Sequence, residues 1–165
     1  MKAIVAVDKN WGIGKNNDLL FSIPEDMKFF RATTLNKVVV MGSNTLKSFP
    51  NGSPLKNRTN IVLSSKLKRD DCIVVDSLEK LFDEIKKYDA DDVYVIGGAM
   101  LYKTLLNYCS EILVTKVNAD GQAQVFFENL DANQNFVCAD KSDVISTNGY
   151  DIQFTTYKNL NTKNI

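Results

Sequence analysis

The segment Val93-Tyr-Val-Ile-Gly97-Gly98-Ala-Met100 joins an apolar, β-branched run to a pair of glycines and then to a helical pattern. Such a run is typical of a strand that is buried on both faces of a parallel sheet. Paired glycines let the backbone approach a phosphate closely, and a following helix adds free amide groups and a positive dipole end. A tight strand-to-helix turn without a ligand explains the same letters, so both interpretations stay open here.

Similar apolar runs occur on both sides of this segment, and they predict strands at residues 3–7, 37–41, 60–63, 72–75, 92–96 and 111–117. Helical patterns lie between several of them, at residues 24–35, 44–49, 77–88 and 99–107. This alternation predicts crossover connections and a largely parallel sheet. Two further strand-like segments, 135–140 and 151–158, flank the turn-forming sequence Ser146-Thr-Asn-Gly149 and predict a C-terminal antiparallel hairpin.

The expected fold is therefore α/β, with a predominantly parallel central sheet of about eight strands between helices on both faces, which makes three layers. The chain has 165 residues, of which 44% are hydrophobic, so it can bury one sizeable core but hardly two. We expect a single domain over residues 1–165, without internal repeats or linkers.

Charge and cysteine content narrow the class of function. Lys+Arg and Asp+Glu both number 20, so no excess positive charge favours nucleic acid or an anionic membrane surface. The apolar start, residues 1–8, is too short for a signal segment, and no other run is long enough to span a membrane. The 3 cysteines are far apart, which favours free thiols in a reducing compartment. We expect a cytoplasmic protein.

The chain contains 0 histidines, which excludes Ser-His and Cys-His nucleophiles, histidine-ligated metals and imidazole acid–base chemistry. No C-x-x-C pair indicates structural zinc, so we expect no metal. Proton transfer must then rely on Asp, Glu, Lys, Tyr, Cys or water.

The start of the first helical pattern contains two acidic residues for which the sequence predicts different roles. Ser22-Ile-Pro-Glu25 matches a capping box, in which the Ser22 hydroxyl and the Glu25 carboxylate satisfy amides at the helix start. Asp26 shares a helix face with Phe30 and Thr33, which makes it a candidate active-site acid. The alternative is an acid that is merely favoured by the helix dipole.

A loop and an arginine are further candidates. Residues 11–21 form a glycine-hinged loop with an apolar tip that could close over a ligand or simply pack on the surface. Gly12-Ile-Gly14 lacks the third glycine of a dinucleotide fingerprint and leads into no helix, which argues against a standard Rossmann domain. Arg58 could bind a carboxylate through its planar fork or lie in solvent.

Taken in order, five motifs resemble the dihydrofolate reductase family from Ala3 to about Tyr157: Gly14-Lys-Asn-Asn17-Asp-Leu19, Pro24-Glu-Asp26, Met41-Gly-Ser-Asn-Thr45, Leu63-Ser-Ser65 and Ile96-Gly-Gly98. The resemblance implies reduction of 7,8-dihydrofolate to tetrahydrofolate by NADPH, with direct hydride transfer to pterin C6 and protonation at N5. Such an enzyme supports one-carbon metabolism and thymidylate synthesis, and antifolate inhibitors are expected to bind in the same pocket. A monomer is expected.

The resemblance also assigns site residues. Catalytic roles fall to Asp26, which would bond the pterin, to Thr115, which would hold that network, and to Phe21 of the lid. The expected substrate-binding residues are Ile4, Val5, Asp26, Phe30, Ser48, Phe49, Leu55, Arg58, Ile96 and Thr115. The expected cofactor-binding residues are Ala6, Ile13, Gly14, Asn17, Leu19, Gly42, Ser43, Asn44, Thr45, Leu63, Ser64, Ser65, Lys66, Ile96, Gly97, Gly98, Ala99, Met100, Leu101 and Tyr102.

Three positions depart from the family pattern. Leu20-Phe21 stands where many bacterial members have Pro-Trp, and residues 119–127 lack the G-D-T of the segment that partners the lid. Ser43 stands where many members have a basic residue for the cofactor 2′-phosphate. Ser64, Ser65 and Lys66 would replace part of that contact, unless Lys66 is simply solvated, and NADPH would then be preferred by roughly ten- to a hundredfold.

Two rival functions remain open at this point. A pyrimidine reductase of riboflavin synthesis shares the fold and the cofactor, but Arg58 and Asp26 favour a folate. A nonenzymatic nucleotide- or folate-binding module is the other alternative, although neither the substrate-side acid nor the nicotinamide-side loop is degraded.

Overall fold

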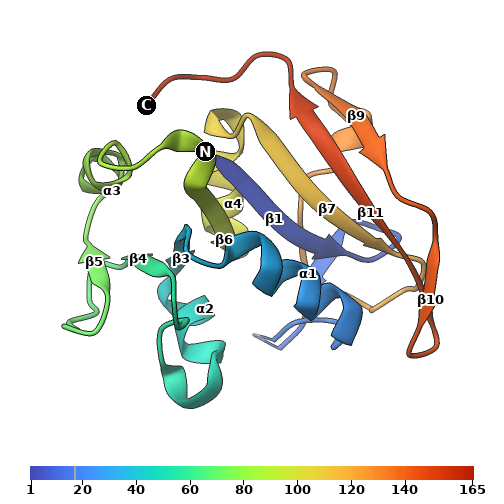
Figure 1. Ribbon diagram of the computed structural model, residues 1–165, viewed down its shortest axis with the longest axis horizontal. Coiled ribbons are helices and arrows are strands. Elements are labelled where there is room, and N and C mark those ends of the chain that lie inside the picture. Colours follow the sequence, from blue (N-terminus) through green and yellow to red (C-terminus); the bar gives the residue numbers. More distant parts are fainter. Residues whose placement is uncertain (17) are drawn as a thin grey trace.

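A central sheet runs through the molecule in the strand order β10-β11-β7-β1-β6-β3-β4-β5, and β9 also pairs with β11 (Figure 1). The computed structural model describes residues 1–16 and 18–165. The strands of this sheet are β1 (Lys2–Val7), β3 (Val38–Gly42), β4 (Thr59–Leu63), β5 (Ile73–Val75), β6 (Val93–Gly97), β7 (Glu111–Val117), β9 (Phe136–Lys141), β10 (Ile145–Thr147) and β11 (Tyr150–Asn159). The helices are α1 (Pro24–Thr34), α2 (Ser43–Ser48), α3 (Leu78–Ile85) and α4 (Ala99–Leu105), and a small second sheet pairs β2 (Gly12–Gly14) with β8 (Val125–Phe126).

The predicted sheet is confirmed in both its parallel and its antiparallel part. β7, β1, β6, β3, β4 and β5 are parallel neighbours, whereas β11 runs antiparallel to β7, β9 and β10. Between the two predicted C-terminal strands lies the short strand β10, which joins β11 through Asn148 and Gly149. Both turn residues have positive φ, 51° and 80°, which is the backbone that a two-residue hairpin turn requires.

Alternation along the strands builds a separate core on each face of the sheet. One set of alternate residues packs with Leu81 and Ile85 of α3 and with Leu101 and Leu105 of α4. On the other face, Val39, Met41 and Val62 pack with Leu46 of α2. α1 covers that second face further along, since the rings of Phe29 and Phe154 are 4.5 Å apart. The three predicted layers are present.

The predicted capping box at Ser22 and Glu25 is wrong. Helix α1 begins at Pro24, its N-cap is Ile23, and no side chain caps it. The residue before a proline is disfavoured in the α region, so Ile23 stays extended (φ −116°, ψ 112°) and Ser22 falls one position too early. By contrast, the Ser77 side chain does cap α3, accepting a hydrogen bond from the Lys80 amide at 3.2 Å.

Two further features bear on the sequence expectations. Cys72, Cys109 and Cys138 are all free, as expected. Within the part of the chain that the structure describes, no helix combines the length and the apolarity needed to cross a membrane.

Candidate active site

Asp26 and Thr115 meet between α1 and the sheet. Thr115 lies on β7, and its hydroxyl donates a 2.7 Å hydrogen bond to Oδ1 of Asp26 in the first turn of α1. Burial raises the pKa of the Asp26 carboxyl above its ordinary value, and the bond from Thr115 offsets only part of this. The two residues assigned to the pterin therefore form one polar contact in a surrounding that disfavours charge.

The strand beside Thr115 completes this polar region. Ala6 of β1 is in register with Thr115, and the carbonyl of Ile4, two residues earlier, accepts a 2.7 Å hydrogen bond from the Tyr102 hydroxyl. Burial and the nearby charge of Asp26 raise the pKa of Tyr102 far above its usual range, so this phenol stays neutral. The Val5 side chain packs in the core on the opposite face, and Val5 can therefore offer a ligand only its backbone.

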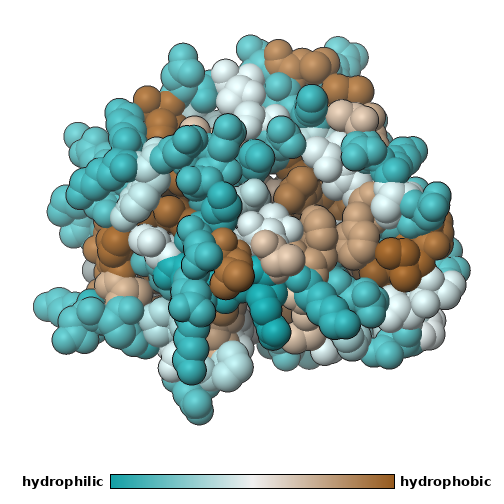
Figure 2. All heavy atoms as spheres, in the orientation of Figure 1, coloured by the Kyte–Doolittle hydropathy of each residue, from teal (hydrophilic) through white to brown (hydrophobic). Residues whose placement is uncertain are grey.

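An apolar wall continues from this point. Phe49, Leu55 and Ile96, all assigned to the substrate, pack together against the core around Met41 and Leu46. On the face of the molecule seen in Figure 2, the more hydrophobic residues form a band from the centre toward the side where β10 lies, between more hydrophilic margins. Phe30 is half-buried on α1, whereas the exposed Ser48 donates its hydroxyl proton to the Thr45 carbonyl at 2.6 Å.

Arg58 is held rigidly beside the end of α1. Its Nε donates to Thr34 Oγ1 at 3.2 Å, and its terminal nitrogens donate to the carbonyls of Lys56 at 2.9 Å and Arg31 at 3.4 Å. A guanidinium has five N–H groups, so one donor on each terminal nitrogen remains for a ligand. Burial, and next the charge of Arg31, lowers the pKa of Arg58, which indicates that the two cations are neighbours. The remaining donors of Arg58, with a second positive charge nearby, form a suitable site for a carboxylate.

The two glycine motifs assigned to the cofactor touch each other. Gly97 has φ 144°, and a Cβ there would lie 2.9 Å from Thr45 Oγ1. A Cβ on Gly42 would lie 3.9 Å from the amide nitrogen of Gly98. The ends of β3 and β6 thus form one backbone surface on which a side chain at position 97 would collide with Thr45, and this surface suits a phosphate-bearing ligand. Of the following residues, Met100 is exposed, but Leu101 and Tyr102 point into the core.

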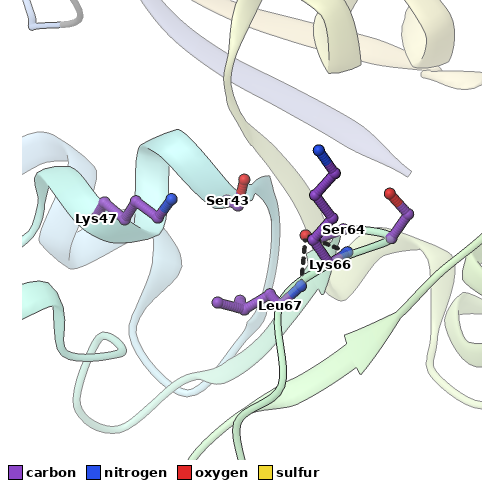
Figure 3. A pocket seen from close by; sticks show the side chains of 6 residues that line it. Ser43, Lys47, Ser64, Lys66 and Leu67 are labelled. Carbon is purple, nitrogen blue, oxygen red and sulfur yellow. Dashed lines mark hydrogen bonds between the residues drawn. The ribbon is translucent and has the colours of Figure 1, made fainter.

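A cleft of about 410 Å³ continues from this surface (Figure 3). It is lined by Ser43, Lys47, Ser64, Ser65, Lys66 and Leu67. Ser64 Oγ accepts hydrogen bonds from the amides of Lys66 at 3.3 Å and Leu67 at 3.1 Å, which fixes the turn after β4. The side chain of Leu63, at the end of β4, packs inward against the main core.

Comparisons with known proteins agree with this geometry. The family described as dihydrofolate reductase matches residues 1–159. The chain belongs to the dihydrofolate reductase family. The enzyme of Bacillus subtilis is 34% identical over 161 residues, covering 96% of this chain and 94% of its own length. The enzyme of Haemophilus influenzae is 36% identical over 128 residues, covering 77% of this chain and 78% of its own length.

A solved structure supports the fold as well. The dihydrofolate reductase of Enterococcus faecalis, complexed with NADP(H) and RAB-propyl, superposes with a TM-score of 0.83 at 29% identity, covering 96% of this chain and 95% of that chain. Enzymes of this family reduce dihydrofolate with NADPH, and the chain is one of them.

The described part of the loop at residues 11–21, the expected lid of this dihydrofolate reductase, contacts the partner segment at residues 119–127, although that segment lacks the G-D-T motif. β2 pairs with β8, and Gln124 donates its amide to the Gly14 carbonyl at 2.8 Å. The Gln124 side chain in turn accepts a hydrogen bond from the Asn16 amide at 2.9 Å. Asn17, one of the residues assigned to the cofactor, lies outside the described residues.

At the tip of this loop, one apolar side chain is exposed to solvent and another packs against the protein. Leu19 is 78% exposed, whereas the ring of Phe21 packs edge-on against Tyr150, with centroids 5.1 Å apart. Ile13, by contrast, packs against the main core. Phe21 therefore lies against the C-terminal hairpin, whereas the side chain of Leu19 is exposed.

Two residues that the sequence pattern did not single out, Arg31 and Asp8, lie beside residues of the candidate site. Arg31 was not singled out, because only its position beside Arg58 distinguishes it from a solvated lysine or arginine at a helix end. Asp8 is 3% exposed, and its carboxylate accepts hydrogen bonds from the amides of Asn10 at 2.8 Å, Gly12 at 2.7 Å and Gly121 at 3.0 Å. It joins the start of the lid to its partner segment. The signal for Asp8 was the Asp8-Lys-Asn-Trp-Gly12 sequence, since aspartate before a glycine-containing turn commonly bonds the backbone that follows.

No group of three or more His, Cys, Asp or Glu side chains arranged for a metal ion is found in residues 1–16 and 18–165.

Proposed function

We propose that the chain reduces 7,8-dihydrofolate with NADPH, and that Asp26 is the acid that binds and polarises the pterin. The observation that carries this assignment is the half-buried Asp26 carboxylate, bonded to Thr115 through Oδ1. Oδ2 accepts no hydrogen bond from the described residues, so it is available to a ligand. Oδ1 retains a second lone pair beside its bond from Thr115, so both oxygens can accept from the adjacent ring N–H and exocyclic amino group of a pterin.

The residues around Asp26 then have distinct parts in the reaction. Bound NADPH supplies the hydride. The Asp26 charge favours the protonated pterin, and a water near its carboxylate is the proposed proton donor to N5. Ile4 and Ile96 line the pterin side, and Phe49 and Leu55 exclude water from the middle of the substrate.

Arg58 and Arg31 are proposed to bind the glutamate tail of the substrate. Two N–H groups of Arg58 are free, and its position is fixed by three hydrogen bonds. A pre-organised fork loses less entropy on binding a carboxylate than a freely moving side chain does. The tail distinguishes folates from the ribosyl phosphate of the pyrimidine reductase alternative, so these arginines favour the folate.

We further propose that this enzyme acts as a cytoplasmic monomer with one domain over residues 1–165, and that antifolates bind in the pterin site. The free thiols and the continuous central sheet support these proposals.

The direct test is to mix the purified protein with NADPH and dihydrofolate and to follow the loss of nicotinamide absorbance. We expect turnover with dihydrofolate and none with the aminopyrimidine ribosyl phosphate of riboflavin synthesis. Asp26→Asn retains the shape of the side chain and an acceptor for Thr115 but removes the charge. Its hydride-transfer rate should fall by roughly two orders of magnitude near neutral pH. An unchanged rate in this variant would remove Asp26 from the mechanism.

A further inference from the structure

Helix α2 carries a cation beside its neutral first residue. Ser43 begins the helix, and Lys47 lies four residues further on, so the two side chains share one helical face. Figure 3 shows both residues lining the cleft, with the ammonium end of Lys47 turned toward Ser43. The expectation that α2 offers a phosphate no positive charge, which rests on Ser43 alone, is therefore incomplete.

The opposite wall of the cleft adds hydroxyl groups and a second cation. Ser64, Ser65 and Lys66 lie in the turn after β4, which faces α2 across the cleft (Figure 3). Ser64 Oγ accepts two backbone hydrogen bonds, so its own proton remains free to be donated to a ligand.

The charge in this cleft is unbalanced. Among the described residues, none of those that line it is acidic. None of the ion pairs formed by the described residues includes Lys47 or Lys66. Two ammonium groups with three hydroxyl groups and no carboxylate favour a dianionic phosphate over the neutral hydroxyl of a ribose.

We propose that Lys47 is the residue through which this enzyme prefers a dinucleotide carrying a 2′-phosphate, with Lys66 and the serine hydroxyls completing the contacts. The proposal rests on the proposed function, because it places the adenosine end of NADPH in this cleft. The cation that position 43 lacks is supplied one helical turn later, on the same face of α2.

The size of the preference follows from the kind of contact. Lysine contributes a flexible point charge rather than a bidentate fork, and one charge-assisted hydrogen bond corresponds to about a tenfold change in affinity. Lys47 is exposed, so its contribution should decrease as salt is added.

The experiment is a titration by isothermal calorimetry of the intact enzyme with NADP⁺ and NAD⁺, and with the fragments 2′,5′-ADP and 5′-AMP, at low and high salt. Wild type should bind the 2′-phosphorylated member of each pair more tightly. Lys47→Gln should weaken NADP⁺ and 2′,5′-ADP binding by about tenfold while changing the NAD⁺ and 5′-AMP affinities less than about twofold. The loss should be smaller at high salt.

Two further variants separate the proposal from a general effect of charge or folding. Lys86→Gln removes the same charge from the end of α3, outside the cleft, and should leave all four affinities unchanged. Ser43→Lys combined with Lys47→Gln moves the cation back by one turn and should restore the preference for NADP⁺.

The outcomes distinguish the proposal from the function on which it rests. An unchanged ratio of NADP⁺ to NAD⁺ affinity in Lys47→Gln, or equal affinities in wild type, overturns the role of Lys47 while reduction of dihydrofolate can still be measured. Absence of binding for every nucleotide, together with absence of turnover, overturns the proposed function itself.

Discussion

Asp26 is positioned by a neutral hydroxyl rather than by a cation. The identity of this partner affects both the pKa of the carboxyl group and the stability of the fold. A positive partner would lower the carboxyl pKa, whereas burial beside Thr115 leaves it raised. The site thus holds a carboxyl group that binds a proton more readily than an exposed carboxyl group does.

We therefore expect Asp26→Asn to stabilise the protein while it impairs catalysis. A carboxyl whose folded pKa lies above its unfolded value of 3.8 favours the native state when protonated and opposes it when ionised. The gain in unfolding free energy of the Asn variant should be present near neutral pH, decrease as the pH falls through the raised pKa, and vanish below 3.8. Urea denaturation across this pH range measures it.

Glu25→Gln is the matched control, because Glu25 precedes Asp26 in the same turn but is exposed. Its unfolding free energy should stay within about 0.5 kcal/mol of wild type at every pH. A gain equal to that of Asp26→Asn would mean that net charge, not burial, causes the effect.

The arginine pair can be separated because only one member supports the fold. Arg58 bonds Thr34 and two carbonyls, so Arg58→Leu should weaken dihydrofolate binding by roughly thirtyfold and also lower stability. Exposed Arg31 makes no side-chain hydrogen bond among the described residues, and Arg31→Gln should weaken substrate binding by several-fold with stability unchanged. A pterin without the glutamate tail should bind wild type and both variants alike. Equal loss for that pterin would show that the pair does something else.

At the scale of elements, the sequence predicted those strands and helices whose formation depends on residues close together in the chain. β-branched runs placed most strands of the central sheet within a residue or two. The predicted start of α1 was wrong. A capping box at Ser22 requires Ile23 to be helical, but the residue before a proline is disfavoured in the α region, and this restriction prevails. Contacts between distant segments, such as Asp8 with Gly121, have no counterpart in local pattern.

Two serines test this account of helix starts. Ser77 accepts a hydrogen bond from the Lys80 amide, and Ser77→Ala should lower the unfolding free energy by about 1 kcal/mol. Ser22 caps nothing, so Ser22→Ala should be neutral to within about 0.5 kcal/mol. Denaturant unfolding of the two variants provides the measurement, and a comparable loss in Ser22→Ala would restore the capping box.

At the scale of the whole molecule, both proposed ligand sites are built from the middle of one sheet. The cofactor surface joins the ends of β3 and β6, and the Asp26–Thr115 pair lies two strands from β6, on β7. Composition and pattern sufficed to predict this architecture, since parallel strands bring their carboxyl ends to one edge. Lys66 was among the residues assigned to the cofactor, but Lys47 was not, because Lys47 and the turn with Lys66 line one cleft only through the pairing of β3 with β4.

Because the sites share one sheet, each ligand should stabilise the whole domain in a single cooperative transition. A ligand that binds only the native state, present at a hundred times its dissociation constant, adds about 2.7 kcal/mol. For a domain of this size such a gain corresponds to a rise in Tm of roughly 5 to 10 °C.

Calorimetry of wild type should therefore show one transition that NADP⁺ shifts upward, and at equal concentration NAD⁺ should shift it less. In Asp26→Asn the shift caused by NADP⁺ should persist while that caused by a folate decreases, since Asp26 is assigned to the pterin alone. A second transition, or loss of the NADP⁺ shift in Asp26→Asn, would contradict the division of the site between α1 with β7 and the ends of β3, β4 and β6.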